Sequence, residues 1–148
     1  MKLTVKRAAA ALALAAALPV AAASSASAAT SSGCTVTPQT PTYSYTATNG
    51  VKVLRYDITV TCNGGRTANI YQEVWEEDTF SDDHISSTTT SRTFSTYGTQ
   101  TVSLYRYLPD TELGMEEMYQ KVRFTVSSNG VTSPVTGWER SGVRAFYN

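Results

Sequence analysis

Residues 53–62 show the most regular alternation of apolar and polar side chains in this sequence. Their even positions are apolar or sulfur-bearing, namely Leu54, Tyr56, Ile58, Val60 and Cys62. From Arg55 onward the odd positions are polar. Because successive side chains of a β-strand point to opposite faces, this period of two predicts a strand with one buried face.

A second strand of the same kind is predicted over residues 119–127, whose apolar face carries Val122, Phe124 and Val126. Weaker strand patterns occupy residues 35–42, 43–48, 68–77, 88–96, 99–108 and 131–148. The first of these contains two prolines, which cannot donate a backbone hydrogen bond. It is therefore predicted to be an edge strand or an extended arm that Cys34 holds against the sheet.

Turn signals separate these strands. Asn49-Gly50 and Asn129-Gly130 are typical of tight β-hairpins, because both residue types tolerate positive φ. Residues 78–90 are polar and acidic and are predicted to form a long loop, and residues 108–117 a loop or a single helical turn. About seven short strands without a helical period predict an all-β protein, an antiparallel β-sandwich that is loosely immunoglobulin-like.

Residues 1–28 are predicted to be a signal peptide. Basic residues are followed by an apolar, alanine-rich run from Ala8 to Ala23 and by Ala26-Ser27-Ala28, the small-x-small pattern that signal peptidase recognises. A leader this rich in alanine is typical of actinobacteria. We therefore expect a secreted, extracellular protein whose mature chain, residues 29–148, is a single domain.

The mature chain is mildly acidic, with nine Lys or Arg and twelve Asp or Glu, a net charge of −3 (9 − 12). Nucleic-acid binding requires a concentrated basic face, which this composition does not supply. No segment is both basic and amphipathic. We therefore expect no nucleic-acid partner and no membrane insertion.

Cys34 and Cys62 are the two cysteines of the sequence. Outside the cell a structural disulfide between them is expected, since no Cys-x-x-Cys spacing or histidine cluster suggests a redox or metal role. Closing this loop should stabilise the fold by about 3.5 kcal/mol. The alternative is lipidation of Cys34. Ser31 disfavours it, because lipidation signals usually carry an apolar residue three positions before the cysteine.

Half of the acidic residues lie within eleven positions: Glu73, Glu76, Glu77, Asp78, Asp82 and Asp83. No Lys or Arg occurs between Thr67 and Ser91. Clustered carboxylates repel one another unless they are solvated, bind a cation or face a basic partner. Three interpretations follow: a solvated loop, a contact surface for a basic protein, and a calcium site at Asp78, Asp82 and Asp83, whose spacing matches no known calcium loop.

All nine tyrosines lie in the mature chain, together with Trp75 and Trp138. Aromatic residues suit pleated surfaces, but Tyr, Trp and Arg also dominate protein–protein binding energy, and Tyr105-Arg106-Tyr107 is the best short example. The candidate partner-binding residues are Tyr71, Trp75, Glu76, Glu77, Asp78, Asp82, Asp83, Tyr105, Arg106 and Tyr107.

No arrangement of residues indicates catalysis. His84 is the only histidine, and the sequence contains neither a Gly-x-Ser-x-Gly nucleophile elbow nor a cofactor motif. We therefore expect a non-enzymatic protein without a cofactor.

The stretch Val74-Trp75-Glu76-Glu77-Asp78-Thr79 resembles a strand-end segment of the tendamistat-type α-amylase inhibitors, small secreted proteins of actinobacteria. The resemblance covers six of the 120 mature residues and implies inhibition of a secreted hydrolase. Those inhibitors carry a Trp-Arg-Tyr recognition triplet and two disulfides. Here the nearest triplet is Tyr105-Arg106-Tyr107, elsewhere in the chain, and only one disulfide is possible.

Three hypotheses for function follow. The leading one is a non-catalytic module that binds another secreted or cell-surface protein, as an adaptor or small subunit of an extracellular assembly such as an antibacterial toxin particle. The second is an inhibitor of a hydrolase, either a protease or an α-amylase, which predicts a rigid loop projecting from the sandwich at residues 105–107 or 78–85. The third is a calcium- or carbohydrate-binding module.

Overall fold

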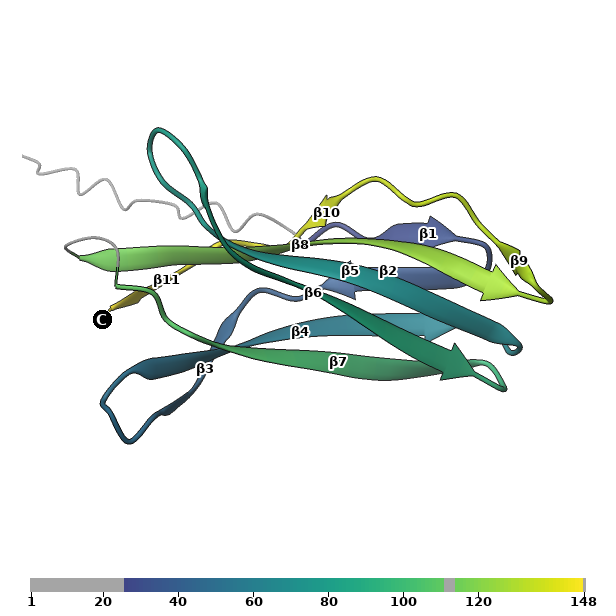
Figure 1. The fold of residues 1–148 in the computed structure, drawn as a ribbon, viewed down its shortest axis with the longest axis horizontal. Helices are drawn as coiled ribbons and strands as arrows, with labels where there is room; N and C mark the ends of the chain where they lie inside the picture. Colours follow the sequence, from purple (N-terminus) through teal and green to yellow (C-terminus); the bar gives the residue numbers. More distant parts are fainter. Residues whose placement is uncertain (1–25, 111–113, 148) are drawn as a thin grey trace, which may run out of the picture.

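The computed structural model describes residues 26–110 and 114–147, which form eleven strands in two antiparallel sheets packed face to face (Figure 1). Those residues contain no helix long and apolar enough to cross a membrane. The predicted β-sandwich with one disulfide is confirmed. The strands are β1 (Ala29–Ser31), β2 (Cys34–Pro38), β3 (Thr42–Thr46), β4 (Lys52–Cys62), β5 (Arg66–Glu76), β6 (Asp83–Phe94), β7 (Gly98–Tyr107), β8 (Met115–Ser128), β9 (Val131–Thr132), β10 (Glu139–Arg140) and β11 (Arg144–Tyr147).

The smaller sheet is built around β4, the strand with the clearest alternation. Its five even-numbered side chains from Leu54 to Cys62 are buried, as predicted. On one side β4 pairs with β2 and β3 in succession, and on the other it pairs with β7 from Val53 to Cys62. Strand β1 extends the sheet beyond β2.

The larger sheet has β5 at its centre, between β6 and β8. The short strands β9, β10 and β11 pair in turn along the far edge of β8. The predicted hairpin at Asn129-Gly130 joins β8 to β9, with φ values of 51° and 76° at these two residues. Val122, Phe124 and Val126 of β8 are buried as predicted.

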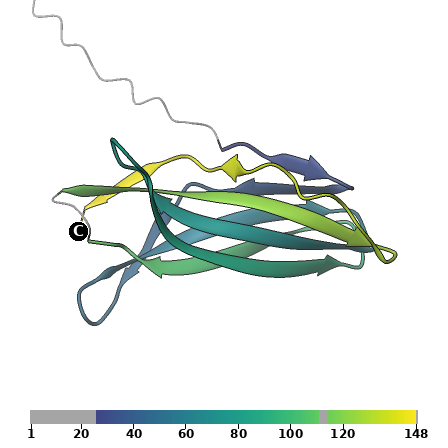
Figure 2. The same cartoon turned by 45° about the horizontal axis from the view of Figure 1, so that its top comes forward.

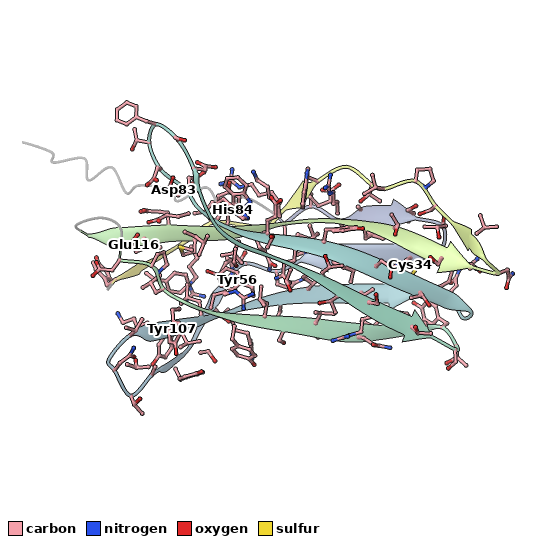
Figure 3. All side chains as sticks on the ribbon, in the orientation of Figure 1. Cys34, Tyr56, Asp83, His84, Tyr107 and Glu116 are labelled. Carbon is pink, nitrogen blue, oxygen red and sulfur yellow. A yellow bond between two sulfur atoms is a disulfide. The ribbon has the colours of Figure 1, made fainter. Side chains whose placement is uncertain are left out.

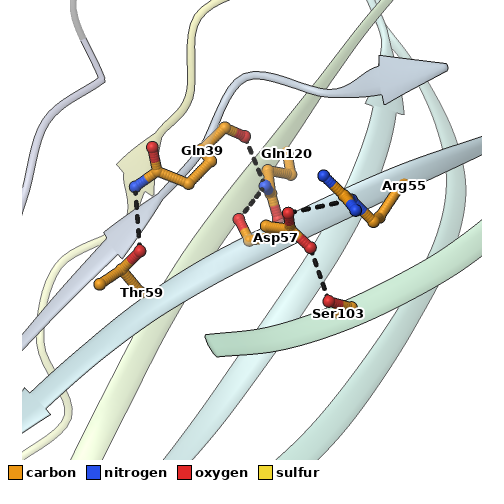
Figure 4. A network of polar contacts seen from close by, with 6 residues as sticks. All are labelled: Gln39, Arg55, Asp57, Thr59, Ser103 and Gln120. Atoms are coloured by element: carbon orange, nitrogen blue, oxygen red, sulfur yellow. Dashed lines mark hydrogen bonds and ion pairs between the residues drawn. The ribbon is translucent and has the colours of Figure 1, made fainter. Parts of the chain in front are cut away.

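The interior contains two apolar clusters, one around the disulfide and the other around Leu54, Tyr56 and Met118. Gln72 and Gln120 are also buried. The Gln72 amide donates to Gln120 Oε1 (2.7 Å). Gln120 Nε2 in turn donates to the backbone oxygens of Gln39 (2.6 Å) and Asp57 (2.8 Å) (Figure 4). These bonds satisfy buried amides and link β5 and β8 of one sheet to β4 of the other.

The disulfide joins β2 to β4 within the smaller sheet rather than linking the two sheets. Cys34 and Cys62 are register partners, with their Cα atoms 4.1 Å apart. The prediction that Cys34 holds the N-terminal segment against the strand carrying Cys62 is confirmed. The prediction that this segment is an edge strand is wrong, because β1 pairs with the first three residues of β2. Pro38 lies beyond the end of β1, where a missing backbone donor costs no hydrogen bond to that strand.

Several predicted boundaries are wrong. The loop predicted over residues 78–90 is shorter, because β6 begins at Asp83, and β8 begins at Met115 inside the predicted 108–117 loop. Strand β6 lies at the edge of the larger sheet, so its inward positions lie at the rim of the core and need no apolar side chains. The strand forms because its backbone pairs with β5 along its whole length. The predicted count of about seven strands was too low, because β1 was not predicted and the single strand expected over residues 131–148 is divided into β9, β10 and β11. Residues 1–25 of the predicted signal peptide and 111–113 of the predicted turn lie outside the described residues.

Candidate functional site

The outer face of the larger sheet carries three rows of cross-strand neighbours. They form because β5 exposes its odd positions, and β6 and β8 present the register partners of those positions. Read from β6 across β5 to β8, the rows are Thr89–Tyr71–Arg123, Ser87–Glu73–Lys121 and His84–Trp75–Tyr119.

Contacts between rings and cations hold the rows together. Lys121 Nζ lies 4.1 Å from the Trp75 ring centre, and the His84 ring meets Trp75 edge-on with centroids 5.0 Å apart. The Trp75 indole N–H also donates to Glu73 Oε2 (2.9 Å). Because each ring is fixed by at least one neighbour, this face has a defined shape before any ligand binds.

The third row anchors the loop of the β5–β6 hairpin, residues 77–82. At one end of the loop, Glu77 forms an ion pair with Arg140 (2.6 Å), whose guanidinium lies 3.7 Å from the Tyr119 ring centre. At the other end, the Tyr119 hydroxyl donates to Asp82 Oδ2 (2.5 Å). The loop is therefore tied to β8 and to the C-terminal segment.

The surroundings of the Asp82–Tyr119 hydrogen bond favour an ionised Asp82 and a neutral Tyr119. The pKa of Asp82 is lowered, chiefly by the hydrogen bond from Tyr119 and further by the Asp78 backbone N–H and the nearby Arg140. The pKa of Tyr119 is raised, first by burial and then by its bond to Asp82. Both shifts favour an ionised Asp82 carboxylate that accepts a hydrogen bond from a neutral Tyr119 phenol.

Phe80 lies within this anchored loop, and its side chain is 99% exposed. The loop projects away from the two sheets in both ribbon views (Figures 1 and 2). Asp83 and His84 lie where the loop joins β6 (Figure 3). The hairpin thus presents a large apolar side chain on a fixed base.

The acidic stretch does not form one continuous acidic surface. Glu76 is only 1% exposed, because its even position on β5 points between the sheets, so its prediction as a partner contact is wrong. Glu73, Glu77 and Asp82 are each engaged by the contacts described above. Lys121 and Arg140 supply the positive charges beside this acidic stretch. Both are distant in sequence, so residues 67–91 alone give no sign of them.

Metal-ligand geometry is not found at the candidate calcium residues. Asp82 is engaged by Tyr119, and within residues 26–110 and 114–147 no group of three or more His, Cys, Asp or Glu side chains could hold an ion. Asp78 and Asp83 therefore have no converging ligands in the described part of the chain.

The Tyr105-Arg106-Tyr107 triplet lies on the smaller sheet and is divided by strand alternation. Tyr105 and Tyr107 are exposed on the outer face, where Tyr107 lines a depression of about 300 Å³ with Tyr45 and Val53. Arg106 points toward the other sheet, and its Nε–H donates to Ser86 of β6 (3.1 Å). The ten candidate residues thus fall on two outer faces and the interior, and only Tyr71, Trp75 and those of the hairpin lie together.

Other residues of this face were not predicted. Lys121 and Arg123 occupy the polar positions of the 119–127 alternation, and pairing that strand with residues 68–77 would have placed them opposite Glu73 and Tyr71. Arg140 belongs to the two-residue strand β10, which is too short to leave an alternation in the sequence.

Glu116 is a buried residue that was not predicted either. It continues the inward alternation of β8 beyond the predicted start of that strand, near the end of the sandwich labelled in Figure 3.

Comparison with known proteins adds little to this geometry. No protein-family model matches the chain, and no curated protein matches it. A solved X-ray structure, Northeast Structural Genomics Consortium target SoR45, aligns over 80% of this chain and 87% of its own, with 14% sequence identity and a TM-score of 0.36. A similarity this low carries neither fold nor function across.

Proposed function

We propose that this protein is an exported, non-enzymatic module that binds another secreted or cell-surface protein, as an adaptor or small subunit of an extracellular assembly. The observation that carries the proposal is the β5–β6 hairpin, which presents a 99% exposed Phe80 between two anchors, Glu77–Arg140 and Asp82–Tyr119. The most useful contact in a protein interface is an aromatic side chain that fills a pocket of the partner.

Burial of Phe80 would supply a substantial part of the binding energy. Transfer of a fully exposed Phe side chain into an apolar pocket is worth about 2 kcal/mol, or roughly thirtyfold in Kd. The two anchors reduce the conformational freedom that the loop loses on binding. Trp75, Lys121 and His84 lie beside the base of the hairpin and supply the aromatic and charged surroundings of such a contact.

Export is supported by the pattern of residues 1–28 and by the Cys34–Cys62 disulfide, a bond that persists in oxidising compartments. Mass spectrometry of protein recovered from culture medium tests this part directly. The expected mature chain begins at Ala29. Recovery of the full-length chain inside the cell, with no form in the medium, would refute export.

The binding proposal is tested by co-purification from culture medium followed by reconstitution with the identified partner. Phe80→Ala should weaken the reconstituted complex by roughly thirtyfold. Tyr97→Ala is the matched control, because Tyr97 is 72% exposed in the turn at the opposite end of β6 and should leave the affinity unchanged. A protein recovered as a lone monomer under every growth condition would exclude the adaptor role.

Inhibition of a secreted hydrolase is the second candidate, and the same hairpin favours it. A projecting loop with a fixed base and one exposed ring has the shape needed to enter an enzyme cleft. A panel of purified secreted proteases and α-amylases separates the two proposals. Inhibition that Phe80→Ala abolishes and Tyr97→Ala preserves would support the inhibitor, whereas failure across the panel leaves the adaptor as the better account.

A further inference from the structure

A depression of about 420 Å³ lies on the outer face of the larger sheet, formed by the first two rows of cross-strand neighbours. Its outward side chains are Tyr71, Glu73, Ser87, Thr89, Arg123 and Trp138. Its volume falls within the range of small-ligand sites. None of these residues belongs to the hairpin loop, so the depression is a separate feature of this face.

Two aromatic rings form part of its wall. Trp138, from the segment between β9 and β10, and Tyr71 of β5 are each 39% exposed. Both rings contact Arg123, whose guanidinium carbon lies 4.4 Å from the Trp138 ring centre and 5.6 Å from that of Tyr71. One cation therefore orients both rings while a large part of each remains open to solvent.

The remaining lining is polar and carries both donors and acceptors. Ser87 and Thr89 contribute hydroxyl groups from β6, and Glu73 contributes a carboxylate. Arg123 is half-buried and contributes the N–H donors of its guanidinium to the same lining. The lining can therefore both donate and accept hydrogen bonds.

We propose that this depression binds a neutral oligosaccharide. A sugar ring has an apolar C–H face and a rim of hydroxyl groups, which match the aromatic rings and the hydroxyl, carboxylate and guanidinium groups respectively. Glu73 opposes a phosphate or other anion beside Arg123. The polar lining is equally unsuited to a purely apolar ligand, because its groups would lose water without gaining partners.

The test uses the intact protein and four neutral hexasaccharides as probes: chitohexaose, cellohexaose, xylohexaose and mannohexaose. NMR titration follows the two indole N–H signals, which report Trp138 in the depression and Trp75 in the third row. We expect at least one probe to shift the Trp138 signal in a saturable manner. Isothermal titration calorimetry, which does not need the Trp138 signal, then measures the variants. Trp138→Ala and Tyr71→Ala should each weaken that binding by about tenfold or more, through loss of ring stacking.

Two controls make the result specific. Tyr105→Ala removes a comparably exposed ring from the opposite sheet and should not change the affinity. Phe80→Ala should also leave saccharide binding intact, so the result is independent of the hairpin proposal. Unfolding curves of every variant exclude loss of the fold as the cause of weaker binding, and the titration of the unmodified protein does not depend on any variant.

Three outcomes would overturn the proposal. The first is no shift of the Trp138 signal by any of the four probes at millimolar concentration. The second is binding that Trp138→Ala and Tyr71→Ala leave unchanged. The third is a response to a fifth probe, a chondroitin sulfate hexasaccharide, but to none of the neutral ones, that is abolished at 150 mM salt; it would indicate charge attraction to Arg123 and Lys121 instead.

Discussion

The hydroxyl of Tyr119 donates a 2.5 Å hydrogen bond to the carboxylate of Asp82, joining the middle of the sheet to the end of its projecting hairpin. Tyr119 is buried although it belongs to the outer face, with Arg140 stacked on its ring. The bond therefore combines a shielded donor with a charged acceptor, which makes it stronger than an ordinary surface contact.

This bond predicts a stability plateau bounded on both sides by pH. The pKa of Asp82 is lowered in the folded state, so its contribution is complete above the unfolded pKa, near 4, and is lost as pH falls through the lower folded value. The pKa of Tyr119 is raised, so its contribution is complete below about pH 10 and is lost as pH rises further. Asp82→Asn and Tyr119→Phe should each destabilise the protein by about 1 kcal/mol at pH 7.

Urea unfolding between pH 2 and pH 11 measures both effects. The difference between wild type and Asp82→Asn should shrink below pH 4. In a double-mutant cycle at pH 7 the second substitution should add little to the first. Fully additive losses would mean that the two groups do not act together.

Gln120 predicts a large loss of stability on conversion to an apolar residue. Gln120→Leu removes the partner of the Gln72 amide and of the backbone oxygens of Gln39 and Asp57. Leaving these buried groups unsatisfied should cost about 2–4 kcal/mol in the free energy of unfolding. Gln100→Leu is the control, since Gln100 makes a single 3.3 Å bond on the exposed β7 edge and should cost under about 1 kcal/mol. Equal losses in the two variants would contradict the role of Gln120 as a link between the sheets.

Glu76 and Asp83 should respond differently to substitution although both belong to the acidic stretch. Glu76→Ala removes a buried and engaged side chain and should cost about 2 kcal/mol or more, whereas the exposed Asp83→Ala should stay within about 0.5 kcal/mol. Thermal or urea unfolding of the two variants makes the comparison. A negligible effect of Glu76→Ala would show that its burial is not important to the fold.

Removal of the disulfide should lower stability without changing the binding surfaces. Replacing both Cys34 and Cys62 by Ala should reduce the free energy of unfolding by about 2–4 kcal/mol. The bond lies inside the smaller sheet, on the opposite side of the core from the hairpin and the depression, so affinities measured below the unfolding transition should be retained. Weaker partner binding by a folded double variant would show that the two sheets are more strongly coupled than the structure indicates.

Sequence alternation was sufficient to predict β4 and most of β8, because each buries one face against the opposite sheet. It predicted only the second half of β6, as the weak strand over residues 88–96. The inward Ser and Thr side chains of β6 lie at the rim of the sandwich, and its first half is fixed by pairing with β5 and not by an apolar pattern. It also misassigned Glu76 as a partner contact, because that residue was chosen for its place in an acidic cluster and not for the face of the 68–77 strand on which it lies. The site depends on which strands are neighbours, and the contact between Lys121 and Trp75 joins residues 46 positions apart.

The segment between β9 and the end of β10 contributes to both features of the outer face. Trp138 packs against Arg123 at the depression, and Arg140, two residues later, holds Tyr119 and Glu77 at the base of the hairpin. This segment is held to β8 by the pairs of β10 and by hydrogen bonds of Ser133 and Thr136 with Val126 and Phe124. Proteolytic cleavage within it would disassemble the depression and loosen the hairpin in one event, while leaving the disulfide and the interior of the sandwich in place. The two surfaces would therefore be lost together, before the fold itself.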